Sequence, residues 1–158
     1  MSDRTRLRRK PDRTVEDRDA IHAVYTFGTG AGWHGWMPAG ERRKVQVMWN
    51  LVLPLIVAIK GYQAWNWLGL GEVLPKGVYR DWKHWCRYPR YFFEDPKMAW
   101  LNEHFAAVRT PIVGAVSLDD LWAGPESRDA FMSAFSGAAY QPRDIDPKAL
   151  GLKPLGHM

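Results

Sequence analysis

Two adjacent carboxylates are the residues best placed for chemistry in this chain. Asp119 and Asp120 follow the apolar run at residues 112–116, which is continuous rather than alternating and therefore typical of a strand covered on both faces in a parallel sheet. Open α/β sheets carry their working side chains just beyond the carboxyl ends of the strands. A carboxylate there can orient and stabilise a neighbouring base, while a solvated or helix-capping role for the same pair stays open.

A histidine, His157, lies in a glycine-containing loop beyond the next predicted strand. A lone histidine usually has no role, but an acid after one strand and a histidine after the next form the second half of the Ser, Asp/Glu, His order of α/β-hydrolases. In that chemistry the carboxylate fixes the imidazole tautomer and the imidazole takes the proton of the nucleophile. We therefore expect Asp120 and His157 to lie close together at the carboxyl edge of the sheet, beneath a helical cap.

The nucleophile that such a pair would serve has no clear candidate. The single cysteine, Cys86, falls inside a predicted helix, where a packing role is expected rather than a reactive thiol. The other histidines are scattered singly without metal-ligand spacing, so we expect neither a metal site nor a cofactor. No Gly-x-Ser-x-Gly motif occurs, and all the serines lie outside the strand-turn-helix context of a nucleophile elbow: Ser2, Ser117, Ser127, Ser133 and Ser136.

The elements that must position these residues predict an α/β fold with parallel strands. The apolar run at residues 21–27 predicts a strand that enters a glycine-rich turn at residues 28–32. That turn lacks the third glycine and the Lys-Ser/Thr of a phosphate loop, so a tight turn is expected rather than a phosphate site. Further strands are expected at residues 112–116 and 138–143, and helices at 41–59 with a kink at Pro54, 77–88, 95–108 and 125–137.

Composition divides the chain into four segments. Residues 1–20 form a polar, basic leader that is expected to be disordered, and residues 21–36 hold the first strand and its turn. Residues 37–108 form a helical cap, and residues 109–158 hold a strand, the acid loop, a helix, a strand and the histidine loop. The tryptophans of the cap are expected to pack its core and to wall an apolar pocket: Trp49, Trp65, Trp67, Trp82, Trp85 and Trp100.

Composition and charge also restrict the partners. The 158 residues are 46% hydrophobic and carry a net charge of +5, but five acids interleave with the seven basic residues of the leader, so no nucleic-acid partner is expected. The most apolar stretch, residues 45–59, contains Gln46, Asn50 and Pro54 and is too short for a transmembrane span. One cysteine excludes an internal disulfide and suits a reducing compartment, so a cytoplasmic location is expected.

Four stretches resemble a bacterial group of predicted α/β-hydrolases related to serine aminopeptidases and monoacylglycerol lipase-like enzymes. The resemblance covers roughly residues 21–158 and implies a partial α/β-hydrolase fold whose last parallel strands carry a helical cap insertion. It implies that Asp120 is the acid and His157 the base of a triad, with a small acyl or ester compound as substrate. The stretches are residues 25–38 (YTFGTGAGWHGWMP), 68–78 (LGLGEVLPKGV) with 82–87 (WKHWCR), 110–123 (TPIVGAVSLDDLWA) and 150–157 (LGLKPLGH).

The chain departs from this family because the strands, oxyanion loop and nucleophile elbow that precede the cap are missing. We therefore expect the carboxyl-terminal portion of a serine ester or acyl hydrolase, inactive alone: a gene fragment, a half completed by another chain, or a remnant reused for binding. The alternative function is a non-enzymatic module whose apolar helices bind a partner or a membrane surface. Self-association through an exposed strand edge is also expected.

Overall fold

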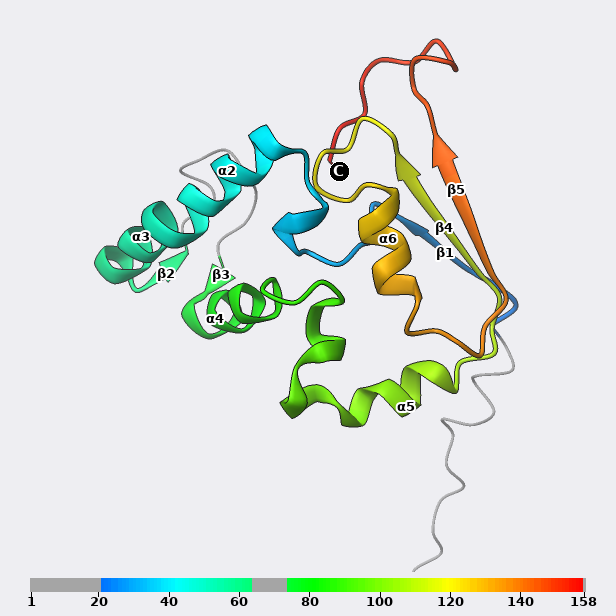
Figure 1. Ribbon diagram of the computed structural model, residues 1–158, viewed down its shortest axis with the longest axis horizontal. Coiled ribbons are helices and arrows are strands. Elements are labelled where there is room, and N and C mark those ends of the chain that lie inside the picture. The colour runs from blue at the N-terminus through cyan, green and yellow to red at the C-terminus, as the bar shows by residue number, and fades with distance from the viewer. Residues whose placement is uncertain (1–20, 64–73, 158) are drawn as a thin grey trace, which may run out of the picture.

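The computed structural model describes residues 21–63 and 74–157, and within them the chain has an α/β fold. Three parallel strands form one sheet in the order β1-β4-β5 (Figure 1). Val24 and Tyr140 flank Ile112 in register, so the predicted class and the parallel pairing are confirmed. The strands are β1 Val24–Phe27, β4 Ile112–Ser117 and β5 Tyr140–Ile145.

The bounds of the two edge strands differ in part from the prediction, although β1 ends at Phe27 as predicted. β1 begins at Val24 rather than at residue 21, and β5 is displaced toward the carboxyl terminus relative to the prediction of 138–143. Pro142 lies within β5, which an edge strand tolerates because only one of its sides is paired. β5 continues to Ile145, whose carbonyl accepts a 2.9 Å hydrogen bond from Leu118 N. The central strand β4 is almost wholly buried, as its apolar run predicts.

Helix α6, Pro125–Met132, packs against one face of this sheet (Figure 1). The sequence predicts a longer helix, ending at Gly137, with Ala130, Phe131, Ala134 and Phe135 on one face. The helix ends at Met132 instead, and its buried positions are Ser127, Arg128 and Met132. The two polar side chains are tolerated in the interior because each has hydrogen-bond partners there.

The guanidinium group of Arg128 is buried between α6 and β5. Its Nη1 lies 2.5 Å from Oδ1 of Asp144, and its Nε lies 2.9 Å from Oδ1 of Asp129. Burial lowers the pKa of Arg128, but hydrogen bonds to the two carboxylates outweigh that effect and raise it. Because a buried cation is tolerated only when it is paired, these two contacts fix how α6 lies against the sheet.

One continuous helical segment, residues 39–60, forms the outer part of the cap. It consists of α2 Ala39–Val47, the π-helical turn η2 Met48–Val52 and α3 Leu53–Lys60. The sequence predicts a kink at Pro54, and the irregular turn lies just before it. Proline has no N–H to donate and its ring clashes with the carbonyl four residues earlier, so the turn before Pro54 cannot keep α-helical hydrogen bonding.

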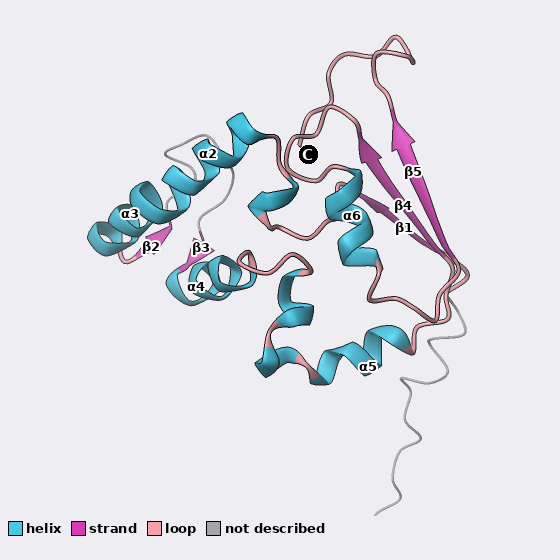
Figure 2. Cartoon of the chain, viewed as in Figure 1, coloured by secondary structure: helices cyan, strands magenta, loops and turns pink. Residues whose placement is uncertain are grey.

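Shorter elements complete the cap, and one of them, η1, lies just before it (Figure 2). The helix predicted at residues 95–108 is divided, because Asp95 caps a separate turn by accepting a hydrogen bond from Lys97 N. A two-residue antiparallel pair, β2 with β3, has no counterpart in the prediction. The elements are η1 His34–Trp36, β2 Tyr62–Gln63, β3 Leu74–Pro75, α4 Lys76–Trp85, η4 Tyr91–Glu94, η5 Pro96–Met98 and α5 Trp100–Ala106.

The apolar core of the cap lies between the 39–60 segment and α4. Trp49 stacks on Tyr79 with ring centroids 5.8 Å apart and meets Trp82 edge-to-face at 4.8 Å. Trp100 is an exception to the expected packing because it is largely exposed. Trp65, Trp67 and the leader at residues 1–20 lie outside the described residues. Among the helices that are described, none has the length and apolar character needed to cross a membrane.

Candidate active site

Asp120 lies in the turn that follows β4, at the carboxyl edge of the sheet. The turn is closed by a 3.1 Å hydrogen bond from Asp120 N to the carbonyl of Ser117. Oδ1 of Asp120 accepts hydrogen bonds from the backbone N–H groups of Trp122 at 2.8 Å and Ala123 at 2.9 Å. The carboxylate is therefore held in one orientation, and only 2% of its side-chain surface is exposed.

The second carboxylate oxygen of Asp120 faces His157. Oδ2 lies 2.9 Å from Nδ1 of the imidazole, so the expected proximity of the two side chains is confirmed. The ring of Trp122 stacks on the imidazole with centroids 5.6 Å apart and an interplanar angle of 26°. No described residue hydrogen-bonds to Nε2 of His157, and 45% of the histidine side chain is exposed. One imidazole nitrogen is thus held by Asp120, and the other has no hydrogen bond from the described residues.

The pKa values of the two groups move apart, as expected for a coupled acid and base. Burial raises the pKa of Asp120, but hydrogen bonds from His157, Ala123 and Trp122 together lower it below its ordinary value. The hydrogen bond to Asp120 raises the pKa of His157 and outweighs the opposing effect of burial. The carboxylate therefore stays ionised and stabilises the protonated imidazole. An acid and a base need these two properties when the base takes the proton of a nucleophile.

Asp119 is a positioning residue that the sequence leaves without a role. Its Oδ2 accepts a 2.9 Å hydrogen bond from Leu155 N, and its Oδ1 accepts one of 3.2 Å from Gly156 N and another from the hydroxyl of Ser117. The hydrogen bond from Ser117 is the largest of the effects that lower the pKa of Asp119. Asp119 thus fixes the backbone of the histidine loop, residues 146–157, beside the carboxylate that binds its imidazole.

The glycine-rich turn after β1 lies against the same site. Gly28 has a φ of 60°, and a Cβ at this position would lie 3.9 Å from Oδ2 of Asp120. A Cβ at Gly30 would lie 2.2 Å from Oγ of Ser127, because Ser127 and Ala31 exchange two hydrogen bonds across this contact. Glycine suits position 28 because of its positive φ, and at position 30 it allows the close approach of the turn to α6.

A cavity of about 280 Å³ joins the histidine to the apolar cap. His157 and the glycine-rich turn line one part of it, and aromatic side chains of the cap line another. The sulfur of Cys86 also borders this cavity, and burial raises the pKa of its thiol to about 12. Its further lining residues are Gly28, Thr29, Gly30, Gly32, Met37, Trp49, Trp82, Tyr91, Trp122, Ala123 and Ser127.

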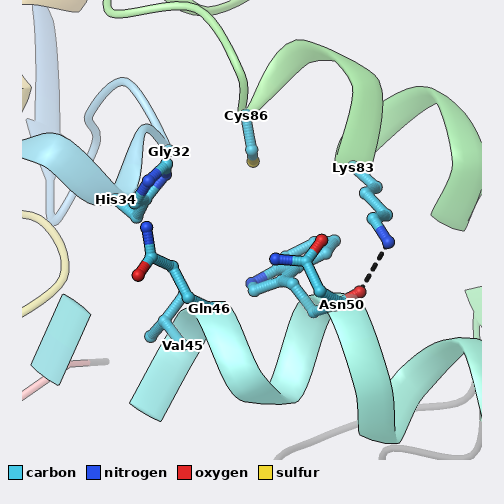
Figure 3. A pocket seen from close by; sticks show the side chains of 8 residues that line it. Gly32, His34, Val45, Gln46, Asn50, Lys83 and Cys86 are labelled. Atoms are coloured by element: carbon cyan, nitrogen blue, oxygen red, sulfur yellow. Dashed lines mark hydrogen bonds between the residues drawn. The ribbon is translucent and has the colours of Figure 1, made fainter. Parts of the chain in front are cut away.

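A second, smaller cavity of about 110 Å³ lies between the 39–60 segment and α4 (Figure 3). Its polar lining groups include Gln46, Asn50 and His34, and Lys83 Nζ donates a 2.6 Å hydrogen bond to the carbonyl of Trp49. Burial is the main cause that lowers the pKa of both Lys83 and His34. This cavity shares Gly32, Trp49 and Cys86 with the larger cavity beside His157.

Three of the described serines bind groups other than the pair. The hydroxyls of Ser117, Ser127 and Ser133 donate to Asp119, to the carbonyl of Ala31 and to that of Ala130. Sequence reasoning predicts the acid and the base from strand ends and chain order, but it misses Asp119 and the stacking ring of Trp122. The pair of adjacent acids is the only sequence signal for Asp119, and nothing local in the sequence indicates that Trp122 stacks on the imidazole.

Known proteins offer no match from which the site could be interpreted. No protein-family model, no curated protein and no solved structure matches this chain.

Proposed function

We propose that this chain carries the acid and the base of an α/β-hydrolase-type ester or acyl hydrolase. The observation that carries the proposal is the 2.9 Å contact between Asp120 Oδ2 and His157 Nδ1 at the carboxyl edge of a parallel sheet. Asp120 accepts the Nδ1–H, which leaves Nε2 as the nitrogen that takes the proton of a nucleophile and returns it to the leaving group. The same Asp120 carboxylate stabilises the imidazolium between the two steps.

The cavity beside His157 supports a small acyl or ester substrate. Its walls combine backbone of the glycine-rich turn with the rings of Trp49, Trp82 and Tyr91. Apolar walls with a few polar groups at one end are typical of small-molecule pockets. We place the acyl group against the rings and the scissile carbonyl near His157, where the proton transfer takes place.

The nucleophile in this proposal is supplied by a segment outside these 158 residues. The sequence has no Gly-x-Ser-x-Gly, and the described serines that donate hydrogen bonds donate to groups other than His157. Among the described residues, none is seen to hydrogen-bond to Nε2 of His157, so the proposal requires a group from elsewhere for this proton acceptor and its orienting acid to activate. The activity of the chain depends on a strand and a nucleophile elbow brought to the same sheet edge.

The first test is to read the coding sequence that adjoins this chain. A strand followed by Gly-x-Ser-x-Gly is expected, and the polypeptide that joins both parts should hydrolyse p-nitrophenyl acyl esters. In that polypeptide, Asp120→Asn should lower kcat by about 10⁴-fold, because the imidazole loses its correct tautomer. The 158-residue chain alone should show no turnover above buffer.

The matched control is His84→Ala. His84 Nε2 lies 3.2 Å from Oδ2 of Asp95 and its side chain is 40% exposed, so it forms a second histidine–aspartate contact of similar exposure within the cap. Activity should survive this change. Activity that falls equally in His84→Ala and Asp120→Asn, or turnover by the isolated chain that depends on His157, would contradict the proposal.

A further inference from the structure

The helical segment at residues 39–60 has two apolar faces, and only one of them is used by the fold. Val45, Trp49, Leu53 and Val57 follow one another at four-residue intervals and are buried in the core of the cap. A second series is displaced by two residues, which places it on the opposite side of the helix. We call this second series the outer ridge, and it consists of Val47, Leu51, Leu55 and Ile59.

The outer ridge is open to solvent along its length. Its four side chains are between 56% and 72% exposed. In Figure 1, the helical segment extends away from the sheet, and α3 lies at the end of the molecule opposite the strands. Contiguous exposed apolar surface of this kind marks a binding surface more often than a lone exposed leucine does.

The charges around the outer ridge favour an anionic partner. Arg43 and Lys44 are exposed where the helical segment begins, and Lys60 is its last residue. Glu41 pairs with Lys44 and accepts a 3.0 Å hydrogen bond from the indole of Trp122. From Arg42 to Gly71 the sequence contains no aspartate or glutamate. The ridge therefore combines apolar side chains with basic ends and lacks acidic side chains between them.

We propose that the outer ridge docks this protein on the surface of an anionic lipid bilayer. The apolar side chains enter the boundary between headgroups and acyl chains, while the basic ends contact the headgroups and the helix lies in the plane of the membrane. A second copy is the weaker occupant. Two ridges packed against each other, in either orientation, place basic ends against basic ends, which costs free energy.

The test is co-sedimentation of the full chain with vesicles. One set contains phosphatidylcholine alone, and the other contains equal parts of phosphatidylcholine and phosphatidylglycerol. The chain should partition about tenfold more strongly to the anionic set, and added salt should weaken that binding. The variant Leu51→Glu with Leu55→Glu should reduce partitioning to both sets by at least about tenfold, because it removes apolar contact and adds negative charge.

Two further variants distinguish the contributions. Trp100→Glu changes another exposed apolar side chain on α5, away from the ridge, and should bind vesicles as the parent chain does. Arg43→Glu should weaken binding to the anionic vesicles and leave binding to neutral vesicles unchanged. Circular dichroism of each variant shows whether the fold is kept, since all these side chains are exposed and their replacement should leave it intact.

The outcomes decide whether the outer ridge binds lipid, binds a second copy of the chain, or binds neither. Equal binding of the ridge variant and the parent chain, or an equal loss in Trp100→Glu, would overturn the proposal. So would a dimer in sedimentation velocity that the ridge variant abolishes, because the second copy would then occupy the surface. None of these measurements needs hydrolytic activity. The membrane proposal can therefore fail or succeed independently of the proposed roles of Asp120 and His157.

Discussion

The carboxylate of Asp120 divides its oxygens between the backbone and the imidazole. Oδ1 binds two N–H groups of its own turn, and Oδ2 binds His157. The backbone contacts fix the orientation of the carboxylate, so the imidazole is positioned by a group that does not itself rotate. This arrangement couples the titration of the histidine to the charge on one buried side chain.

Asp120→Asn should lower the pKa of His157 toward its ordinary value of 6.5. The present pKa is raised first by the hydrogen bond to the carboxylate and then by its charge, and the amide keeps neither the charge nor the same acceptor. A pH titration of the ring protons by NMR measures the change. An unchanged His157 curve would contradict the assigned contact.

The pair should also make stability depend on pH in two steps. The raised pKa of His157 contributes stability that is fully present below 6.5 and is lost as the pH rises through the folded-state pKa. The lowered pKa of Asp120 contributes stability that is present above 3.8 and is lost as the pH falls through the folded-state pKa. Urea unfolding of the parent chain and Asp120→Asn should therefore differ most between these two values, and a difference that does not vary with pH would refute the linkage.

Asp119→Ala should release the histidine loop without touching the Asp120 carboxylate. Leu155 and Gly156 lose the acceptor of their N–H groups, so hydrogen exchange at these two amides should accelerate by about tenfold. Ser117→Ala is the control, because it removes the other partner of Asp119 and leaves both amide contacts in place. Exchange that accelerates equally in both variants would show that the loop is held elsewhere.

At the scale of elements, Arg128 is the side chain that fixes α6 against β5. Arg128→Ala should reduce the free energy of unfolding by about 3 kcal/mol, because it removes a buried side chain together with its hydrogen bonds to Asp129 and Asp144. The exposed Arg143 on β5 offers a matched control, and Arg143→Ala should cost no more than about 0.5 kcal/mol. Urea denaturation measures both, and similar losses in the two variants would refute this role for Arg128.

The elements also show what the sequence could predict. The continuous apolar run of β4 and the chain order of acid and histidine were sufficient for the parallel sheet and for the meeting of Asp120 with His157. The burial of Arg128 was not predictable, because one of its two carboxylate partners, Asp144, lies on β5 and becomes a neighbour only when α6 packs on the sheet. Asp119 was missed for a related reason, since its partners are backbone N–H groups, which every residue type supplies.

At the scale of the whole molecule, the sheet leaves one face of β1 uncovered. The register places Thr26 beside Gly114, which packs against Arg128 of α6, so Tyr25 and Phe27 point to the opposite face. Both side chains are more than 60% exposed. Edge strands with exposed apolar side chains are templates for pairing with another chain.

The chain should therefore associate through β1 as its concentration rises. Replacing Tyr25 and Phe27 together by lysine should weaken this association by about tenfold, because charge on an edge strand opposes pairing. Sedimentation velocity over a concentration series measures it. Leu150→Lys, at an equally exposed leucine of the histidine loop, should leave the association unchanged; a monomer at every concentration in the parent chain would refute the expectation.

The histidine loop is attached to the rest of the molecule by few contacts, so it can open while the rest of the fold stays intact. Its backbone contacts near the imidazole run to Asp119, and its ring contacts run to Asp120 and Trp122, all within one turn after β4. Opening this loop breaks those few contacts and leaves the sheet, α6 and the cap core intact. On warming, the imidazole should therefore leave its carboxylate well below the melting temperature of the sheet, and the Asp120–His157 contact would be lost from a molecule that is still folded.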